Sequence, residues 1–258
     1  QRQMCIRDSV DTPIDEVVQL IEKYDLVAVP VVDSIGRLVG RITVDDVMDE
    51  VREQAERDYQ LASGLSQDVE TDDSVFRQTT ARLPWLLIGM IGGIGNSMIL
   101  GNFDSTFAAH PEMALYIPLI GGTGGNVGTQ SSALVVQGLA NSSLDAHNTW
   151  KQIVKESVVA VINATIISML VYIYNFIRFG ATATVSYSVS VSLFAVVMFA
   201  SIFGTLVPMT LEKLKIDPAI ATGPFISITN DIIGMMLYMG ITVSVSYTHL
   251  TLPTTPYV

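Results

Sequence analysis

Long apolar segments fill the chain from residue 83 onward. They lie at approximately 83–101, 113–139, 153–178, 189–211 and 219–245. Each is near or above the ~20 residues that a helix needs to cross the hydrocarbon core of a bilayer. The second segment is the weakest, because it is rich in Gly, Thr, Ser, Asn and Gln. The pattern predicts an α-helical polytopic membrane protein with five transmembrane helices.

The first sixty residues follow a shorter and more polar pattern. Residues 12–24 place apolar side chains at helical spacing, and a second helical pattern begins at Val44. Between them, strand-forming runs at 26–32 and 37–43 flank a turn at 33–36. The order helix, strand, turn, strand, helix predicts a small α/β unit.

The charge distribution follows the same division. The formal net charge is −11, and residues 1–82 hold 9 of the 14 Lys and Arg and 18 of the 25 Asp and Glu. With 49% hydrophobic and 15% charged residues, the whole chain is too apolar for an ordinary soluble domain. A chain this acidic is unsuited to nucleic acid and better suited to cations. The single cysteine, Cys5, excludes a disulfide framework.

The basic residues around the apolar segments predict an orientation. Six of them flank alternate loops, and the opposite loops hold only Arg178. The six are Arg77, Arg82, Lys151, Lys155, Lys213 and Lys215. Because positive loops stay in the cytoplasm, this bias predicts a multi-pass protein of the cell membrane. Its N-terminus is expected to be cytosolic and its C-terminus outside.

An acidic stripe begins the second helical pattern. Asp46, Asp49, Glu50 and Glu53 are spaced i, i+3, i+4 and i+7, so they share one helix face. A divalent cation that bridges them would remove their mutual repulsion, and carboxylate oxygens suit Mg²⁺ or Ca²⁺. The alternative is a solvated helix face, the usual fate of a charge run.

The last apolar segment carries an unpaired carboxylate, Asp231, near its middle. A carboxylate at that depth costs ~2.5–3.5 kcal/mol on insertion scales, and ionisable groups inside a membrane usually mark an ion pathway. A buried protonated Asp that joins helices is the alternative. Asp217 lies at the inner mouth of the same segment. Asn126, in the glycine-rich run 118–132, offers a neutral oxygen to the water shell of a cation.

Several runs carry family resemblances. GRLVGRITVDDV (36–47) resembles the second half of a CBS motif, where Thr43 and Asp46 would hold the ribose of an adenine nucleotide or simply cap the helix. RLPWLL (82–87), GGTGGNVGTQSSALVV (121–136) and DPAIATGPFISITNDIIGMMLY (217–238) resemble the membrane domain of the MgtE magnesium transporter family.

The resemblance implies passive Mg²⁺ uptake by a homodimer in membrane lipid. Its pore is lined by the second and fifth helices of each subunit. Asp231 is then the ion-site residue, with Asp217 at the cytoplasmic end and Asn126 on the pore wall. Cytosolic Mg²⁺ binds acidic residues next to a connecting plug helix, here at about 72–81, and closes the pore. The acidic stripe is the expected counterpart.

Five regions are expected on these grounds. They are a foreign end at 1–9, the second CBS motif with the acidic helix at 10–60, the connecting (plug) helix region at 61–82, the five-helix pore domain at 83–245 and a second foreign end at 246–258. Both ends resemble translated sequencing adapter.

Two other functions stay open at this stage. One is a proton-coupled divalent cation carrier that uses Asp231, and the other is a membrane Mg²⁺ sensor without transport. An enzyme is not predicted, because the sequence shows no catalytic arrangement of Ser, His, Cys and Asp.

Overall fold

The computed structural model describes residues 8–9, 12–140, 149–180 and 184–250. The chain divides into two compact units, residues 1–59 and 60–258. Most of the two predicted foreign ends lies outside the described residues, which include only 8–9 and 246–250 from them.

The first unit contains a three-stranded sheet in the order β1-β2-β3, with one helix before and one after the β2–β3 hairpin. The elements are β1 (Asp8–Ser9), α1 (Ile14–Tyr24), β2 (Ala28–Val32), β3 (Leu38–Thr43) and α2 (Val44–Ala62), whose last residues belong to the second unit. β2 and β3 are antiparallel, and β1 pairs with β2 in parallel. From α1 onward this is the order of helices and strands expected from the sequence, whereas β1 was not predicted and lies in the expected foreign end at 1–9.

A small apolar core holds the first unit together. Val17 and Ile21 of α1, Val29 of β2 and Val47 of α2 are each at most 4% exposed. The hairpin turn is fixed by Asp33, whose carboxylate accepts hydrogen bonds from two backbone N–H groups of the turn. Asp in this role is typical of tight turns, which explains why the hairpin could be read from the sequence.

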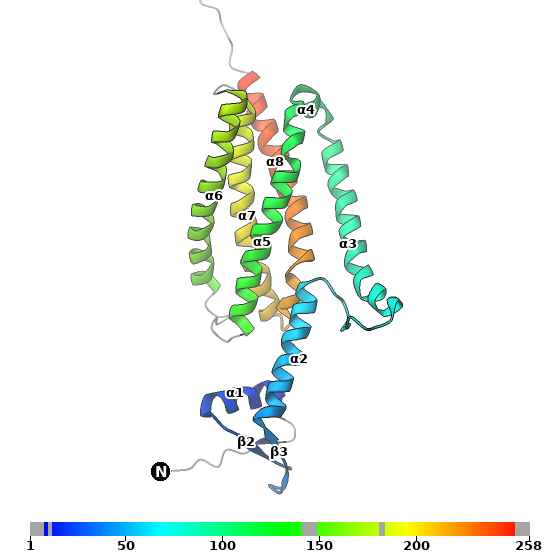
Figure 1. The fold of residues 1–258 in the computed structure, drawn as a ribbon. Helices are drawn as coiled ribbons and strands as arrows, with labels where there is room; N and C mark the ends of the chain where they lie inside the picture. Colours follow the sequence, from blue (N-terminus) through cyan, green and yellow to red (C-terminus); the bar gives the residue numbers. More distant parts are fainter. Residues whose placement is uncertain (1–7, 10–11, 141–148, 181–183, 251–258) are drawn as a thin grey trace, which may run out of the picture. The chain divides into compact units, whose positions relative to one another are not determined.

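The second unit is a helical bundle (Figure 1). Its elements are α3 (Val75–Gly101), α4 (Asp104–Ala109), η1 (Pro111–Tyr116), α5 (Ile117–Ala140), α6 (Thr149–Phe179), α7 (Thr184–Lys213), η3 (Pro218–Ala221) and α8 (Pro224–Leu250). α7 packs against α5, α6 and α8, whereas α3 packs mainly against α8. The core lies where α5, α7 and α8 meet.

Four helices of the described chain are long and apolar enough to cross a membrane. They are Val75–Gly101, Trp150–Phe179, Val185–Lys213 and Pro224–Val245. In the most apolar 18-residue stretch of α7, 56% of the residues are buried within the chain, whereas none are buried in the corresponding stretch of α3. Since apolar side chains that are not buried in protein need another apolar environment, these exposed faces indicate a membrane protein. α5, which corresponds to the second of the five spans expected from the sequence, is not among the four.

One helix covers two regions that the sequence analysis separated. α3 begins at Val75, inside the expected connecting region, and continues without a break to Gly101. Ser74 caps its first turn by accepting a hydrogen bond from the N–H of Arg77. Pro84 lies inside the helix and does not end it.

Glycines allow the closest helix contacts of the bundle. A Cβ atom built on Gly204 of α7 would overlap the backbone carbonyl oxygen of Gly128 on α5. A Cβ on Gly124 of α5 would lie 2.9 Å from a methyl carbon of Val196 on α7. Small residues at such crossings let two helix backbones approach each other, which accounts for the glycine-rich composition of α5.

Candidate ion pathway and acidic region

Asp231 lies on α8 and faces the glycine-rich helix α5. A Cβ atom built on Gly121 would be 3.3 Å from its Oδ1, and one on Gly125 would be 3.6 Å away. The carboxylate is half-buried, and no ion pair or hydrogen bond to it is found among the described residues. The bare backbone of α5 therefore forms one wall beside an unpaired carboxyl group.

The residue before it, Asn230, is fully buried between α8 and α5. Its Nδ2 donates a weak hydrogen bond of 3.4 Å to the carbonyl oxygen of Gly124. Its Oδ1 is buried and has no hydrogen-bond partner in the described part of the chain. Asn230 was not among the residues predicted from the sequence, although an Asn next to Asp231 inside an apolar segment was a usable signal.

Asn126 lies on the exposed side of α5. Gly122 and Gln130, one turn away on either side, are exposed as well. The neighbouring residue Gly125 faces Asp231, so the polar exposed face of α5 begins beside the carboxylate. No hydrogen bond between Asn126 and Asp231 is found in the described residues. Within the described residues this polar face of α5 is not covered by other helices, and in a membrane such a face needs water or protein rather than lipid beside it.

Asp217 has a structural role at the beginning of η3. Its Oδ1 accepts a hydrogen bond of 2.8 Å from the N–H of Ala219, so it caps that short helix. The side chain remains exposed. Its charge is therefore available to an ion although one oxygen is already used.

Within the described residues, no group of three or more Asp, Glu, His or Cys side chains could hold a metal ion. Neither the described part of the bundle nor the acidic stripe of α2 contains such a group within one chain. A bare ion with several direct carboxylate ligands is thus not indicated. A hydrated ion near one carboxylate needs fewer direct ligands, and Mg²⁺ keeps its waters readily.

The four residues of the acidic stripe are not equivalent. Arg57 pairs with Glu50 at 3.2 Å and lies 3.9 Å from Glu53, so a single positive charge is shared by two of the four carboxylates. Asp49 is exposed. These pairings were not predicted from the sequence, because Arg57 is seven residues from Glu50, about two helical turns away.

Asp46 and Thr43 form the N-terminal cap of α2. The carboxylate of Asp46 accepts hydrogen bonds from the Thr43 N–H at 2.8 Å and from the Thr43 hydroxyl at 2.6 Å. The hydroxyl bond, followed by the backbone bond, holds the pKa of Asp46 below its usual range. This is the capping arrangement given above as the alternative to nucleotide binding.

A second acidic cluster precedes α3. Asp68, Glu70, Asp72 and Asp73 line a small hollow of about 240 Å³ together with Arg77. Arg77 pairs with Asp73 at 3.0 Å and donates to the carbonyl oxygen of Asp68. Arg77 therefore holds two sides of the hollow together. Because four carboxylates line it and only one of them is paired with Arg77, the loop keeps a net negative charge.

Long apolar helices packed around a glycine-rich polar helix, with an unpaired carboxylate facing that helix, define a helical membrane protein. The family described as "MgtE: Divalent cation transporter" matches residues 117–241, and the CBS domain family matches residues 9–53. The chain belongs to the MgtE family, whose members are membrane transporters and not enzymes. The resemblance inferred from the sequence motifs is therefore confirmed.

Three similar proteins carry the name "Magnesium transporter MgtE". The one from Bacillus subtilis is 35% identical over 227 residues, which are 88% of this chain and 50% of that protein. Those from Thermus thermophilus and Enterococcus faecalis are 33% and 30% identical over 90% and 88% of this chain, and over 51% and 50% of their own lengths. The chain spans about half the length of the curated relatives it matches.

Proposed function

We propose that the chain forms the pore of a Mg²⁺ transporter through which Mg²⁺ moves passively into the cell. The observation that carries this proposal is Asp231, a carboxylate within α8 that has no basic partner among the described residues and faces the bare backbone of α5. The relatives are named for magnesium, which supports Mg²⁺ as the cargo. An inside-negative potential of 100 mV contributes ~4.6 kcal/mol for a divalent ion, twice the value for a single charge.

The pore is proposed to lie between two copies of the chain, each with five spans that include α5. Support comes from the polar face of α5, where Gly122, Asn126 and Gln130 are exposed in one copy. In a dimer this face and Asp231 would line a water-filled path, and Asp217 would attract ions at its cytosolic end. Membrane lipid is then expected around the outward apolar faces, with the N-terminus cytosolic and the C-terminus outside.

The acidic region is proposed to regulate the pore. Cytosolic Mg²⁺ would bind at Asp46, Asp49, Glu50 and Glu53 and favour a closed state, because charge neutralisation allows acidic segments to approach each other. The region 10–60 is proposed to be the remnant of a pair of CBS motifs, and the match over residues 9–53 supports this. An adenine nucleotide is proposed to bind at Thr43 and Asp46 only if the hydrogen bond between these two side chains breaks first, since they already bind each other.

Flux measurements test the proposed function. Liposomes that hold the purified chain and an Mg²⁺-sensitive dye are expected to take up Mg²⁺ when an inside-negative potential is applied. Uptake should continue after the pH gradient is collapsed and should fall when Mg²⁺ is raised on the cytosolic face. Uptake that needs the pH gradient would indicate a proton-coupled carrier, and no uptake by a folded protein would contradict transport by this chain.

Replacing Arg57 with glutamine is expected to make the regulatory region more sensitive to Mg²⁺. The substitution leaves Glu50 and Glu53 without their basic partner. Exposed ion pairs are worth at most ~1 kcal/mol, so the Mg²⁺ concentration for half-suppression of flux should fall about two- to fivefold. Arg52→Gln is the matched control, because Arg52 pairs with Glu56, outside the stripe. Equal shifts in both variants would contradict a specific role for the stripe.

A further inference from the structure

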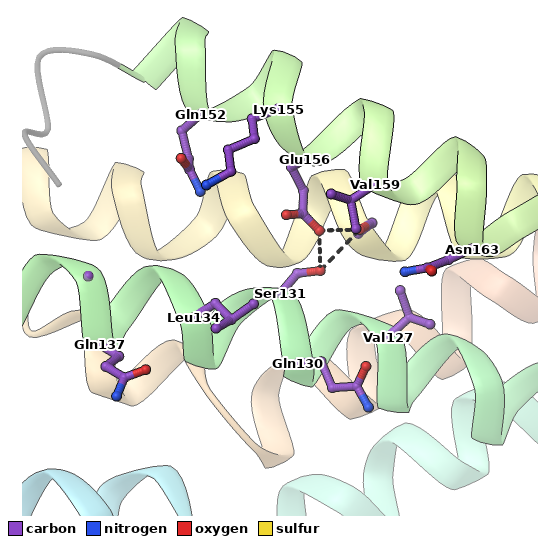
Figure 2. A pocket seen from close by; sticks show the side chains of 12 residues that line it. Val127, Gln130, Ser131, Leu134, Gln137, Gln152, Lys155, Glu156, Val159 and Asn163 are labelled. Atoms are coloured by element: carbon purple, nitrogen blue, oxygen red, sulfur yellow. Dashed lines mark hydrogen bonds between the residues drawn. The ribbon is translucent and has the colours of Figure 1, made fainter. Parts of the chain in front are cut away.

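A polar pocket lies between α5 and α6, away from Asp231, and shares only Gln130 with the polar face of α5 described above. Its volume is about 480 Å³, and among its described lining residues none belongs to α8. Its polar side chains are Gln130, Gln137, Gln152, Lys155, Glu156 and Asn163 (Figure 2). Only Glu156 of these is buried, Gln152 is half-buried and the other four are exposed, so the pocket opens to the surface of the chain around one buried carboxylate. A buried charge needs hydrogen-bond or ionic partners.

Glu156 of α6 is the buried charge of this pocket, only 8% exposed. Its Oε1 accepts hydrogen bonds from the hydroxyls of Ser131 on α5, at 2.6 Å, and Ser201 on α7. The two hydroxyl oxygens are 3.0 Å apart. Three helices thus meet at one carboxylate oxygen, as the dashed triangle in Figure 2 shows.

The second carboxylate oxygen, Oε2, is differently placed. No hydrogen bond or ion pair to it is found within the described residues. In Figure 2 it points away from Ser131, toward the side of the pocket where Gln152 and Lys155 lie. Hydroxyl donors stabilise a carboxylate in its charged form, so the arrangement favours a negative charge with one oxygen open to the pocket.

We propose that this pocket is a second binding site for a hydrated divalent cation, away from Asp231. The proposal rests on the proposed function for the identity of the ion, since Mg²⁺ is the cargo inferred there. Glu156 Oε2 supplies the charge, and the carboxamide oxygens of Gln130, Gln152 and Asn163 accept hydrogen bonds from the water shell. Ions that keep most of their waters need few direct ligands, which fits a pocket with a single carboxylate.

Lys155 allows a test of the proposal, because substitutions of Lys155 and Glu156 should change cation binding in opposite directions. It lines the same pocket as Glu156 and carries the opposite charge. If the pocket binds a cation, Glu156→Gln should weaken binding and Lys155→Gln should strengthen it. If Glu156 only joins three helices, Glu156→Gln should change little, because the amide oxygen can still accept both serine hydrogen bonds, and Lys155→Gln should have no effect.

The experiment uses cysteine modification as a local measurement. Leu134 lines the pocket and is exposed, so Leu134→Cys is made in a Cys5→Ser background of the full chain in lipid nanodiscs. The rates of modification by a cationic and an anionic thiosulfonate are compared with and without millimolar Mg²⁺. Mg²⁺ is expected to slow the cationic reagent. Glu156→Gln should lower the cationic-to-anionic rate ratio about threefold or more and abolish the Mg²⁺ effect. Lys155→Gln should raise the ratio.

Other outcomes would overturn the proposal. A rate ratio unaffected by Glu156→Gln, or an Mg²⁺ effect that survives it, would mean that the pocket does not bind the ion. Gln137→Cys supplies a second reporter on the same pocket, and failure of both positions to react would show that solutes do not enter. Flux measured on the same preparation separates the two proposals: Mg²⁺ protection without flux would leave the pocket site standing and contradict transport, and flux without protection would do the reverse.

Discussion

Asp231→Asn is expected to reduce Mg²⁺ flux in liposomes to the level of protein-free vesicles. The substitution keeps the size of the side chain and removes the charge that faces Gly121 and Gly125. A carboxylate about 5 Å from a divalent ion contributes about 2–7 kcal/mol for effective dielectric constants between 80 and 20. Losing even the lower value reduces the occupancy of the ion site more than about tenfold.

Two further variants show whether the effect is specific. Asp104→Asn makes the same chemical change at an exposed residue in the first turn of α4, and its flux should equal that of the unchanged chain. Asp231→Glu keeps the charge but adds a methylene group where α5 already lies close. We expect partial flux at most, because the longer side chain displaces the carboxylate from its place beside Gly121. Full flux from Asp231→Asn would contradict an ion site on α8.

Asp217→Asn should have a smaller effect than Asp231→Asn. Asn is also a good N-cap residue, so the hydrogen bond to Ala219 and the fold of η3 should be retained. What is lost is one charge in an exposed place, where water and salt weaken its attraction for an ion. The flux should therefore fall modestly at low ionic strength and hardly at all at high ionic strength.

Local patterns account for the parts of the fold that the sequence predicted well. α1 begins two residues after the expected helix start and ends at the expected Tyr24, and β2 and β3 lie inside the expected strand runs. These elements are governed by periodicity and by turn residues close in sequence, such as Asp33. Asp231 was found for a similar reason, because a lone carboxylate in an apolar segment is conspicuous without any knowledge of its neighbours.

Contacts between distant segments account for what was missed. Glu156 falls inside the expected span 153–178, but with Lys155 beside it the pair looks like the charged end of a helix. Only the structure brings Ser131 and Ser201, 25 and 45 residues away, to the same carboxylate. The pairing of Arg57 with Glu50 in α2 was missed for the same reason over a shorter distance, since it spans two helical turns. The run of α3 through residue 82 shows that a change in composition need not coincide with a helix end.

Gly204→Ala is expected to destabilise the bundle and to abolish flux with it. The added Cβ would overlap the carbonyl oxygen of Gly128 and lie 3.1 Å from its Cα and carbonyl carbon. These are backbone atoms of α5, so no side-chain rotation can relieve the overlap, and α5 and α7 must move apart. Overpacking of this kind costs about 1–3 kcal/mol or more. The unfolding temperature in detergent, followed by circular dichroism, should fall by several degrees.

The control for this variant uses the same chemical change where there is space. A Cβ on Gly240 of α8 meets no atom within 4 Å, so Gly240→Ala should leave stability unchanged or raise it by up to ~1 kcal/mol through helix propensity. Equal unfolding temperatures for Gly204→Ala and Gly240→Ala would contradict the close contact of α5 with α7. The comparison with Asp231→Asn then separates charge from packing. We expect Asp231→Asn to lose flux while the stability of the bundle stays normal. Gly204→Ala is expected to lose both flux and stability, because Gly204 allows α7 to pack closely against α5, and α5 is the helix that faces Asp231.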